Sequence, residues 1–272
     1  MDSVEVDAYL RRLGVERPVR PTADALRELH LRHQQRVPFE NLSIHLGEEM
    51  VLEEKWLVQK VVSGGRGGIC YEVNGAFGAL LDALGYEVTL LAARVSGKDG
   101  KLGIPYDHVA LRVVAEDGGE WLADVGFGDH SHYPLVFGER GEQVEAGGVF
   151  RIVESGGEGE VDIVRNGKAE YRLELRPRVL EDFVTGAWWH RTSPKSGFTR
   201  SLVCSRFTED GGRVTLSGRR LKERAADGTV ERRELREDEE VLAVYRERFG
   251  IVLERVPKVR KDDQCEVDHV SG

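Results

Sequence analysis

The chain has 272 residues, of which 40% are hydrophobic and 32% are charged, and its formal net charge at pH 7 is −9. No apolar run is long enough to span a bilayer or to serve as a signal peptide. The negative charge disfavours a nucleic-acid partner, because no basic stripe dominates the sequence. We therefore expect a soluble, cytoplasmic protein without nucleic-acid or membrane partners.

The three cysteines, Cys70, Cys204 and Cys265, show no paired spacing. An odd count without such spacing argues against a disulfide framework and against a zinc site, and it suits a reducing cytosol. We expect no metal.

The first part of the chain has the periodicity of helices. Apolar residues recur at helical spacing in residues 8–14, in residues 25–34 after Pro21 and Thr22, and in residues 53–62. The pattern predicts a small helical domain over residues 1–85, which ends with the segment around Cys70.

Cys70 follows a glycine-rich run, residues 64–68, and begins an apolar-periodic stretch from Ile69 to Leu84 with Gly85 as a stop signal. It therefore lies in the first turn of a predicted helix, where unpaired N–H groups and the helix dipole stabilise a thiolate. The preceding glycines let the backbone turn tightly and let a substrate approach the sulfur. Taken alone, the segment fits a nucleophile and a buried core cysteine equally well.

Strand patterns replace helical ones from Tyr86 onward. They predict an antiparallel sheet, in the form of a barrel, with strands at residues 86–91, 108–114, 120–125, 149–153, 161–164 and 171–175. Further strands at 201–207 and 213–217 precede a helix that begins in the acidic run 237–240 and ends at Gly250. The expected fold class is α+β.

Two residues of the second part could complete a site with Cys70. A cysteine nucleophile needs a base and a group that orients the base, and His108 and Asp124 qualify. A three-residue hairpin loop at 117–119 would set Asp124 opposite Arg112, on the same face as His108 but about 13 Å from it. Contact between the two side chains would then require a bulge or a bend. A histidine or an aspartate beside a hairpin, considered alone, is more often a surface or capping residue.

Three short motifs and their spacing carry a family resemblance. They are Val37 to Leu42 (VPFENL), Arg66 to Glu72 (RGGICYE) and Asp124 to Gly128 (DVGFG). Cysteine, histidine and aspartate follow in that order, with 38 residues from Cys70 to His108 and 16 from there to Asp124. In these features the chain resembles the arylamine N-acetyltransferases, along most of its length.

This resemblance implies a reaction. Cys70 would be the acetylated nucleophile, His108 its base, and Asp124 the residue that holds the imidazole. Acetyl-coenzyme A would be the acyl donor, and an arylamine, hydrazine or N-hydroxyarylamine the acceptor, in a ping-pong reaction of xenobiotic metabolism through an acetyl-cysteine intermediate.

The resemblance also implies an architecture. A helical bundle (1–85) would carry the nucleophile, a β-barrel (86–187) the histidine and aspartate, and an α/β lid would follow (188–272). The active site would lie where the first two parts meet, in an arrangement similar to that of papain-like cysteine proteases.

The resemblance also suggests roles for other residues. Phe39, Val95 and Phe127 are expected to contact substrate, although each could equally be a core residue. Glu40 and Arg66 are expected to pair and to brace the loop that carries the nucleophile. The segment 188–199 resembles a further family stretch, but Ala187 and Trp189 depart from its pattern, so acceptor selectivity is not implied.

Two other enzymatic functions remain open. An amide-forming relative that uses a larger acyl thioester would keep every catalytic residue and differ in pocket shape. A cysteine hydrolase would require water to outcompete the amine. A non-catalytic binding module is disfavoured, because all three positions of the triad are filled. The sequence does not indicate the oligomeric state.

Overall fold

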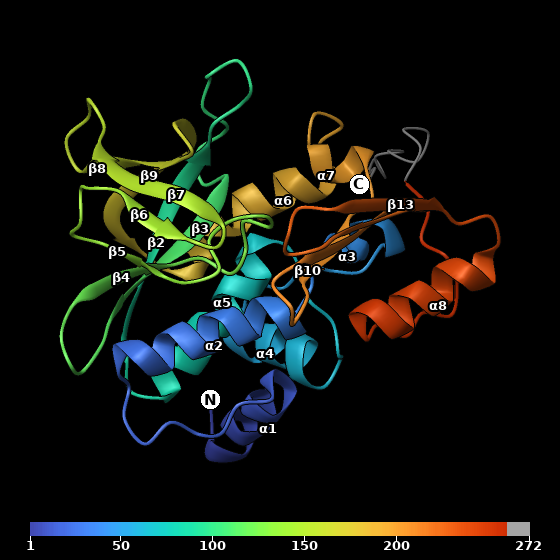
Figure 1. The fold of residues 1–272 in the computed structure, drawn as a ribbon, viewed down its shortest axis with the longest axis horizontal. Coiled ribbons are helices and arrows are strands. Elements are labelled where there is room, and N and C mark those ends of the chain that lie inside the picture. Colours follow the sequence, from blue (N-terminus) through green and yellow to red (C-terminus); the bar gives the residue numbers. More distant parts are fainter. Residues whose placement is uncertain (260–272) are drawn as a thin grey trace, which may run out of the picture.

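The structure is a computed structural model that describes residues 1–259. Cys265 and the end of the expected lid, residues 260–272, lie outside the described residues. The predicted N-terminal helices are confirmed and occupy the lower part of Figure 1. These helices are α1 (Ser3–Leu13), α2 (Ala23–Arg36), α4 (Glu54–Val62) and α5 (Cys70–Ala83). A short helix that was not predicted, α3 (Leu42–Leu46), lies near β10 (Cys204–Phe207).

Local capping fixes where the first two helices begin. Asp2 accepts a hydrogen bond from the Glu5 N–H (2.9 Å) while the Glu5 side chain accepts one from the Asp2 N–H (2.9 Å). Thr22 caps α2 through the N–H of Ala25. Helix α1 ends at Gly14 with φ at +70°, a conformation that glycine adopts without strain.

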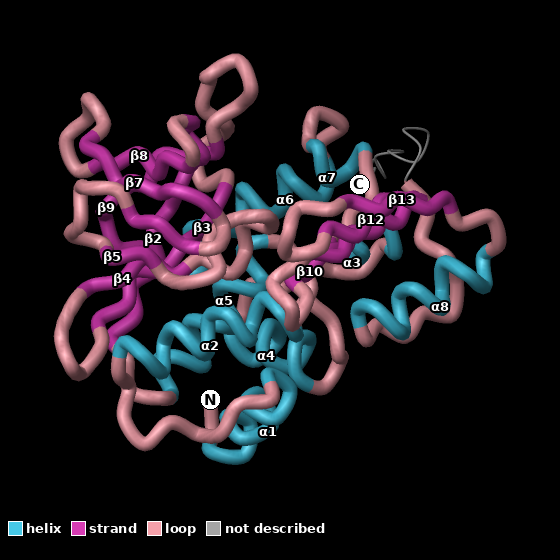
Figure 2. Tube along the Cα trace, in the orientation of Figure 1, coloured by secondary structure: helices cyan, strands magenta, loops and turns pink. Residues whose placement is uncertain are grey.

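The second part is a nearly closed barrel of antiparallel strands, as predicted (Figures 1 and 2). Its spatial order is β5-β4-β3-β2-β9-β8-β7-β6. The strands are β2 (Glu87–Val95), β3 (His108–Val114), β4 (Glu120–Ala123), β5 (Leu135–Val136), β6 (Gln143–Glu145), β7 (Gly148–Glu154), β8 (Glu160–Arg165) and β9 (Lys168–Arg178). At the seam, the Gln143 side chain bonds the backbone N–H and carbonyl of Val136.

The expected register of the β3–β4 hairpin is wrong by two residues. Arg112 pairs with Leu122, and Leu111 with Ala123, so Asp124 follows directly after the strand end, two residues from the level of His108 rather than four. The loop turns one residue earlier than expected: the Gly118 N–H closes a turn on the Ala115 carbonyl (3.1 Å) with Gly118 at φ +98°, and the Glu116 N–H bonds the Pro21 carbonyl (2.9 Å). The distance along the strand is therefore about 7 Å, and no bulge is needed in β3.

The third part joins a second sheet to one helix. The sheet has the order β1-β10-β11-β12-β13, and α8 (Asp238–Phe249) packs against it at the right of Figure 1. Its strands are β1 (Phe39–Glu40), β10 (Cys204–Phe207), β11 (Arg213–Ser217), β12 (Arg220–Arg224) and β13 (Val230–Glu234). The predicted helix and its stop at Gly250 are confirmed.

Three clusters of buried apolar side chains hold the chain together. One lies inside the barrel, and another lies between α8 and the second sheet. The largest joins the N-terminal helices to β2, β3 and the segment formed by η1 (Leu180–Phe183) and α6 (Val184–Thr192), which α7 (Gly197–Arg200) follows. The three-part division stays a prediction, and its boundary between residues 187 and 188 falls inside α6.

Among residues 1–259, the structure has no helix that is both long and apolar enough to cross a membrane.

Candidate active site

Cys70 is the first residue of α5, as predicted, and is 3% exposed. Ile69 precedes it in an extended conformation, and its N–H donates to Glu72 Oε2 (3.1 Å), which satisfies one free donor of the helix start. A Cβ on Gly68 would lie 2.5 Å from the Glu72 side chain. The glycine is therefore needed where the loop turns into the helix.

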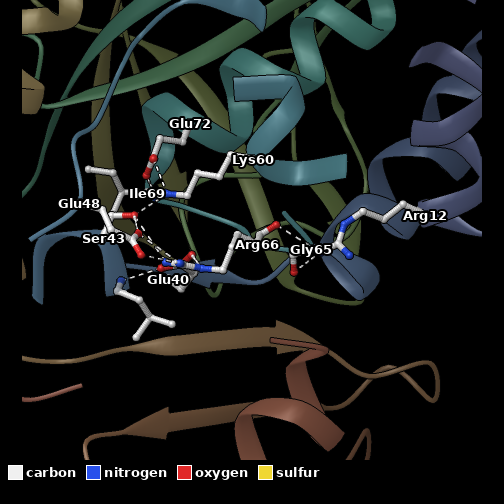
Figure 3. A network of polar contacts seen from close by, with 10 residues as sticks. Arg12, Glu40, Ser43, Glu48, Lys60, Gly65, Arg66, Ile69 and Glu72 are labelled. Atoms are coloured by element: carbon white, nitrogen blue, oxygen red, sulfur yellow. Dashed lines mark hydrogen bonds and ion pairs between the residues drawn. The ribbon is translucent and has the colours of Figure 1, made fainter. Parts of the chain in front are cut away.

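The loop before Cys70 is braced by the predicted Glu40–Arg66 pair. Arg66 Nε donates to Glu40 Oε1 (2.9 Å), and the other Glu40 oxygen accepts from the Leu42 N–H (2.6 Å). Arg12 reaches the carbonyls of Gly65 and Arg66 from α1. Figure 3 shows these contacts on both sides of the loop.

A second ion pair lies next to the first. Lys60 of α4 donates to Glu72 and to Ser43 (Figure 3). Burial alone would raise the pKa of Glu40, but the charges of Lys60 and Arg66 outweigh it and lower that pKa. For Glu72 burial prevails, and its pKa is raised. The nucleophile loop thus rests on buried charges that are mutually compensated.

His108 and Asp124 meet directly. His108 Nε2 lies 2.7 Å from Asp124 Oδ2, and the two side chains are 3% and 1% exposed. Burial acts to lower the pKa of His108, but the Asp124 carboxylate and then the Cys70 sulfur raise it well above the usual value. The same pairing lowers the pKa of Asp124 against the effect of burial. His108 therefore carries its proton at neutral pH, and its Nδ1 is the nitrogen left for the Cys70 sulfur.

Asn74, one turn after Cys70 on α5, holds the aspartate. Its amide nitrogen donates to Asp124 Oδ1 (2.9 Å) and to the Val109 carbonyl (2.7 Å), while its oxygen accepts from the Val125 N–H (2.9 Å). One side chain thus fixes the nucleophile helix to the strand of His108 and to the loop of Asp124. Sequence reasoning missed it, since a buried asparagine on an apolar helix face was its only signal.

Gly126 brings that loop against the helix. A Cβ at this position would lie 2.7 Å from the Cα of Cys70 and 2.7 Å from the amide nitrogen of Asn74. Its N–H donates to Asp124 Oδ1 (3.0 Å). Only glycine allows the backbone to come this close to Cys70.

His30 of α2 supports Asp124 from behind. Its Nε2 accepts the Asp124 N–H (3.1 Å), and its Nδ1 lies 2.9 Å from the His132 carbonyl. Complete burial lowers the pKa of His30 to about 4, so the imidazole is neutral at pH 7. It can then donate from Nδ1 while accepting at Nε2.

A cavity of about 430 Å³ opens onto Cys70 and His108. Phe39, Val95 and Phe127 line it, and the Phe127 ring lies edge-on to His108 with centroids 5.3 Å apart. These are the positions expected to contact substrate, and their role stays a prediction. The remaining lining residues are Asp107, Gly126, His190, Gly197, Phe198, Ser201 and Val203. Neither Trp188 nor Trp189 is among them.

An adjoining cavity of about 260 Å³ shares Phe39 and Val203 with the first. Arg213, Lys222 and Arg224 line it, together with Asp129. Arg224 bonds both oxygens of Asp129 (2.8 Å each), and Arg213 donates to Ser205 and to the Gly128 carbonyl. Lys222 is exposed. The wall thus carries three cations and one anion.

Comparisons with known proteins agree with this architecture. A family model described as N-acetyltransferase matches residues 22–258. The arylamine N-acetyltransferase of Escherichia coli is 31% identical over 89% of this chain and 87% of its own, and human arylamine N-acetyltransferase 1 is 32% identical over 94% and 97%. The solved arylamine N-acetyltransferase of Salmonella typhimurium superimposes with a TM-score of 0.85 at 31% identity, over 92% of each chain. That of Mycobacterium marinum, solved in complex with CoA, gives 0.82 at 31% identity, over 90% and 92%.

Fold and family model together define an enzyme of the N-acetyltransferase class. With relatives above 30% identity along nearly the whole chain, the protein belongs to the arylamine N-acetyltransferase family.

The Glu40–Arg66 brace predicts a stability loss. Replacing Arg66 with Met leaves the fully buried Glu40 without its closest cation, so the free energy of unfolding should fall by about 3 kcal/mol in urea titrations. The control is Arg17→Met, which breaks an exposed pair with Asp7 and should cost under about 1 kcal/mol. Equal losses in the two variants would contradict the brace.

The His108–Asp124 pair predicts a pH dependence. His108 has a raised pKa, so its contribution to stability is complete below its unfolded pKa of about 6.5 and is lost as pH rises through the folded pKa. The difference in free energy of unfolding between wild type and Asp124→Asn should therefore be larger at pH 5.5 than at pH 8.5, with a slope of at most about 1.4 kcal/mol per pH unit.

For comparison, Asp99→Asn removes an exposed carboxylate and should shift stability equally at both pH values. A wild-type advantage over Asp124→Asn that grows with pH would contradict the assigned protonation of His108.

Proposed function

We propose that the protein transfers an acetyl group from acetyl-coenzyme A to the amine of an aromatic acceptor, through an acetyl-Cys70 intermediate. The observation that carries this proposal is the cavity onto which Cys70 and His108 both open, with Asp124 bound behind the imidazole. A cysteine at a helix start, facing a histidine from a sheet, is also the arrangement expected of papain-like cysteine enzymes.

The chemistry follows from these positions. The Cys70 thiolate attacks the acetyl carbonyl carbon, the bond from that carbon to the coenzyme A sulfur breaks, and imidazolium His108 gives its proton to the leaving thiolate. The amine then attacks the acetyl-cysteine, His108 accepts a proton from its nitrogen, and Cys70 leaves as a thiolate. Asp124 stabilises the imidazolium in both resting and product states.

The donor also needs a place for its phosphates. Coenzyme A is polyanionic, whereas the chain carries a net charge of −9, so binding requires local cations. The adjoining cavity offers Arg213, Lys222 and Arg224 beside the acyl site. We assign the phosphates to this wall; the Mycobacterium marinum relative was solved with CoA, which supports coenzyme A as the donor.

The proposed class of acceptor is based on the names of related proteins. One from Salmonella typhimurium, 34% identical over 77% of this chain, is named as both an arylamine N-acetyltransferase and an N-hydroxyarylamine O-acetyltransferase. The aromatic side chains Phe39, Phe127 and Phe198 line the cavity and suit a flat, apolar acceptor.

Both described cysteines are free thiols, which fits a cytoplasmic location where Cys70 stays reduced.

Acetyl-coenzyme A without an amine acceptor should acetylate the enzyme covalently. Intact mass spectrometry of the wild type should show a gain of about one acetyl group, and Cys70→Ala should show none. Cys204→Ala, which removes the other buried thiol, is the control and should still be acetylated. No adduct and no thioester turnover would exclude acetyl transfer, turnover by larger acyl donors would indicate the biosynthetic relative, and rapid turnover without amine would indicate a hydrolase.

The cationic wall predicts a donor-specific defect. Lys222→Gln removes one exposed charge and should raise KM for acetyl-coenzyme A about threefold to tenfold. The rate with p-nitrophenyl acetate, which has no phosphates, should not change. Lys168→Gln on the far strand β9 is the matched control. A similar KM for both variants would place the phosphates elsewhere.

A further inference from the structure

A second histidine–aspartate pair lies in the wall of the Cys70 cavity, apart from the triad. His190 Nε2 of α6 lies 3.0 Å from Asp107 Oδ1, and both side chains line the cavity while only 8% and 11% exposed. Asp107 directly precedes His108 in the chain. The mechanism above uses neither member of this pair.

The hydrogen bonds around the pair assign its protons. The Phe198 N–H donates to Ser196 Oγ (3.1 Å), so the Ser196 hydroxyl is free to donate to His190 Nδ1 (3.2 Å). His190 can then donate only from Nε2, which lies 3.2 Å from the Asp107 main-chain carbonyl oxygen and 3.0 Å from Asp107 Oδ1. The Val95 N–H donates to Asp107 Oδ2 (3.1 Å). Asp107 Oδ2 thus accepts from a backbone N–H, Oδ1 lies beside the imidazole, and an imidazole that accepts at Nδ1 and donates from Nε2 carries no charge.

Ser196, His190 and Asp107 have the composition of a catalytic triad, but they cannot act as one. Ser196 is 1% exposed and does not line the cavity. Its oxygen caps the start of α7 through the Phe198 N–H. The chain of hydrogen bonds therefore holds Asp107 in place and supplies no nucleophile.

The charge of Asp107 is uncompensated within the cavity. Among the described residues that line it, none is lysine or arginine. In the proposed mechanism the charges of the Cys70 thiolate and the His108 imidazolium cancel one another, and His190 in the hydrogen-bonding arrangement above adds none. Each Asp107 carboxylate oxygen keeps at least one lone pair beyond the contacts just described. The acceptor cavity thus carries one net negative charge beside its apolar walls.

We propose that Asp107, positioned by His190, selects acceptors by charge. Aromatic amines with a cationic or hydrogen-bond-donating substituent are preferred to those that carry a carboxylate. This inference rests on the proposed function, since it names the acceptor class for the same site. The physical reason is that a partly buried charge is poorly screened and repels an anion brought into its cavity.

Three flat acceptors of nearly equal shape test this selection: 4-aminobenzamidine (cation), 4-aminobenzamide (neutral) and 4-aminobenzoate (anion). Their amines differ in intrinsic reactivity, so the quantity to compare is the kcat/KM ratio of amidine to benzoate in each variant. Asp107→Asn should lower this ratio about tenfold relative to wild type. Asp99→Asn, which removes an exposed carboxylate outside the cavity, should leave it unchanged. An unchanged ratio in Asp107→Asn would overturn the proposal.

A second measurement on the wild type does not depend on the folding of that variant or on acetyl transfer. Benzamidine, benzamide and benzoate are compared for protection of Cys70 against iodoacetamide, read by intact mass. Protection should be strongest with benzamidine and weakest with benzoate, and the reverse order would overturn the proposal. Failure of acetyl transfer itself would appear separately, as the absence of the acetyl adduct with acetyl-coenzyme A.

Discussion

The carboxylate of Asp124 is the point on which the site's geometry depends. Its Oδ1 accepts hydrogen bonds from Asn74 and Gly126, its Oδ2 binds His108, and its own N–H donates to His30. A buried carboxylate is costly unless every lone pair is engaged. The helices α2 and α5, the strand β3 and the loop after β4 must therefore all be in place for the charge to be tolerated. Folding and assembly of the site are the same event.

Buried charges recur on the other side of Cys70, with a different task. Glu40, Glu72, Lys60 and Arg66 neutralise one another and fix the loop, whereas the His108–Asp124 pair leaves a protonated imidazole facing the sulfur. The first set shapes the backbone that presents the thiol. In the proposed reaction, the second supplies the proton that the leaving thiol requires. Under our proposal, Asp107 has a third role, as a charge in the wall of the acceptor cavity.

Local signals predicted most of the elements. Apolar periodicity and terminal glycines gave the helices, including Cys70 in a first turn, and alternation with turn residues gave the barrel. The short motifs placed Glu40 beside Arg66. These features depend on residues that are close together in the sequence, or on motifs whose pairing the family resemblance implies.

The remaining features depend on contacts between distant segments. The loop of the β3–β4 hairpin, whose register differs from the prediction, is also held by the Glu116 N–H on the Pro21 carbonyl, almost a hundred residues earlier, and no local pattern reports such a bond. His30, Asn74 and the Asp107–His190 pair act across comparable separations. A histidine or asparagine on an apolar face shows that a partner is needed, but not which one.

The two-residue strand β1 has a consequence for how the chain can be divided. Its residues pair with β10, while the Glu40 N–H also bonds the Gly68 carbonyl, directly before the nucleophile helix. The second sheet thus ends in the loop that presents Cys70. A truncation after α7 would strip β1 of its neighbour and expose the edge next to the thiol. The helices and barrel cannot be expected to serve as a minimal catalytic fragment, although they hold all three residues of the proposed triad.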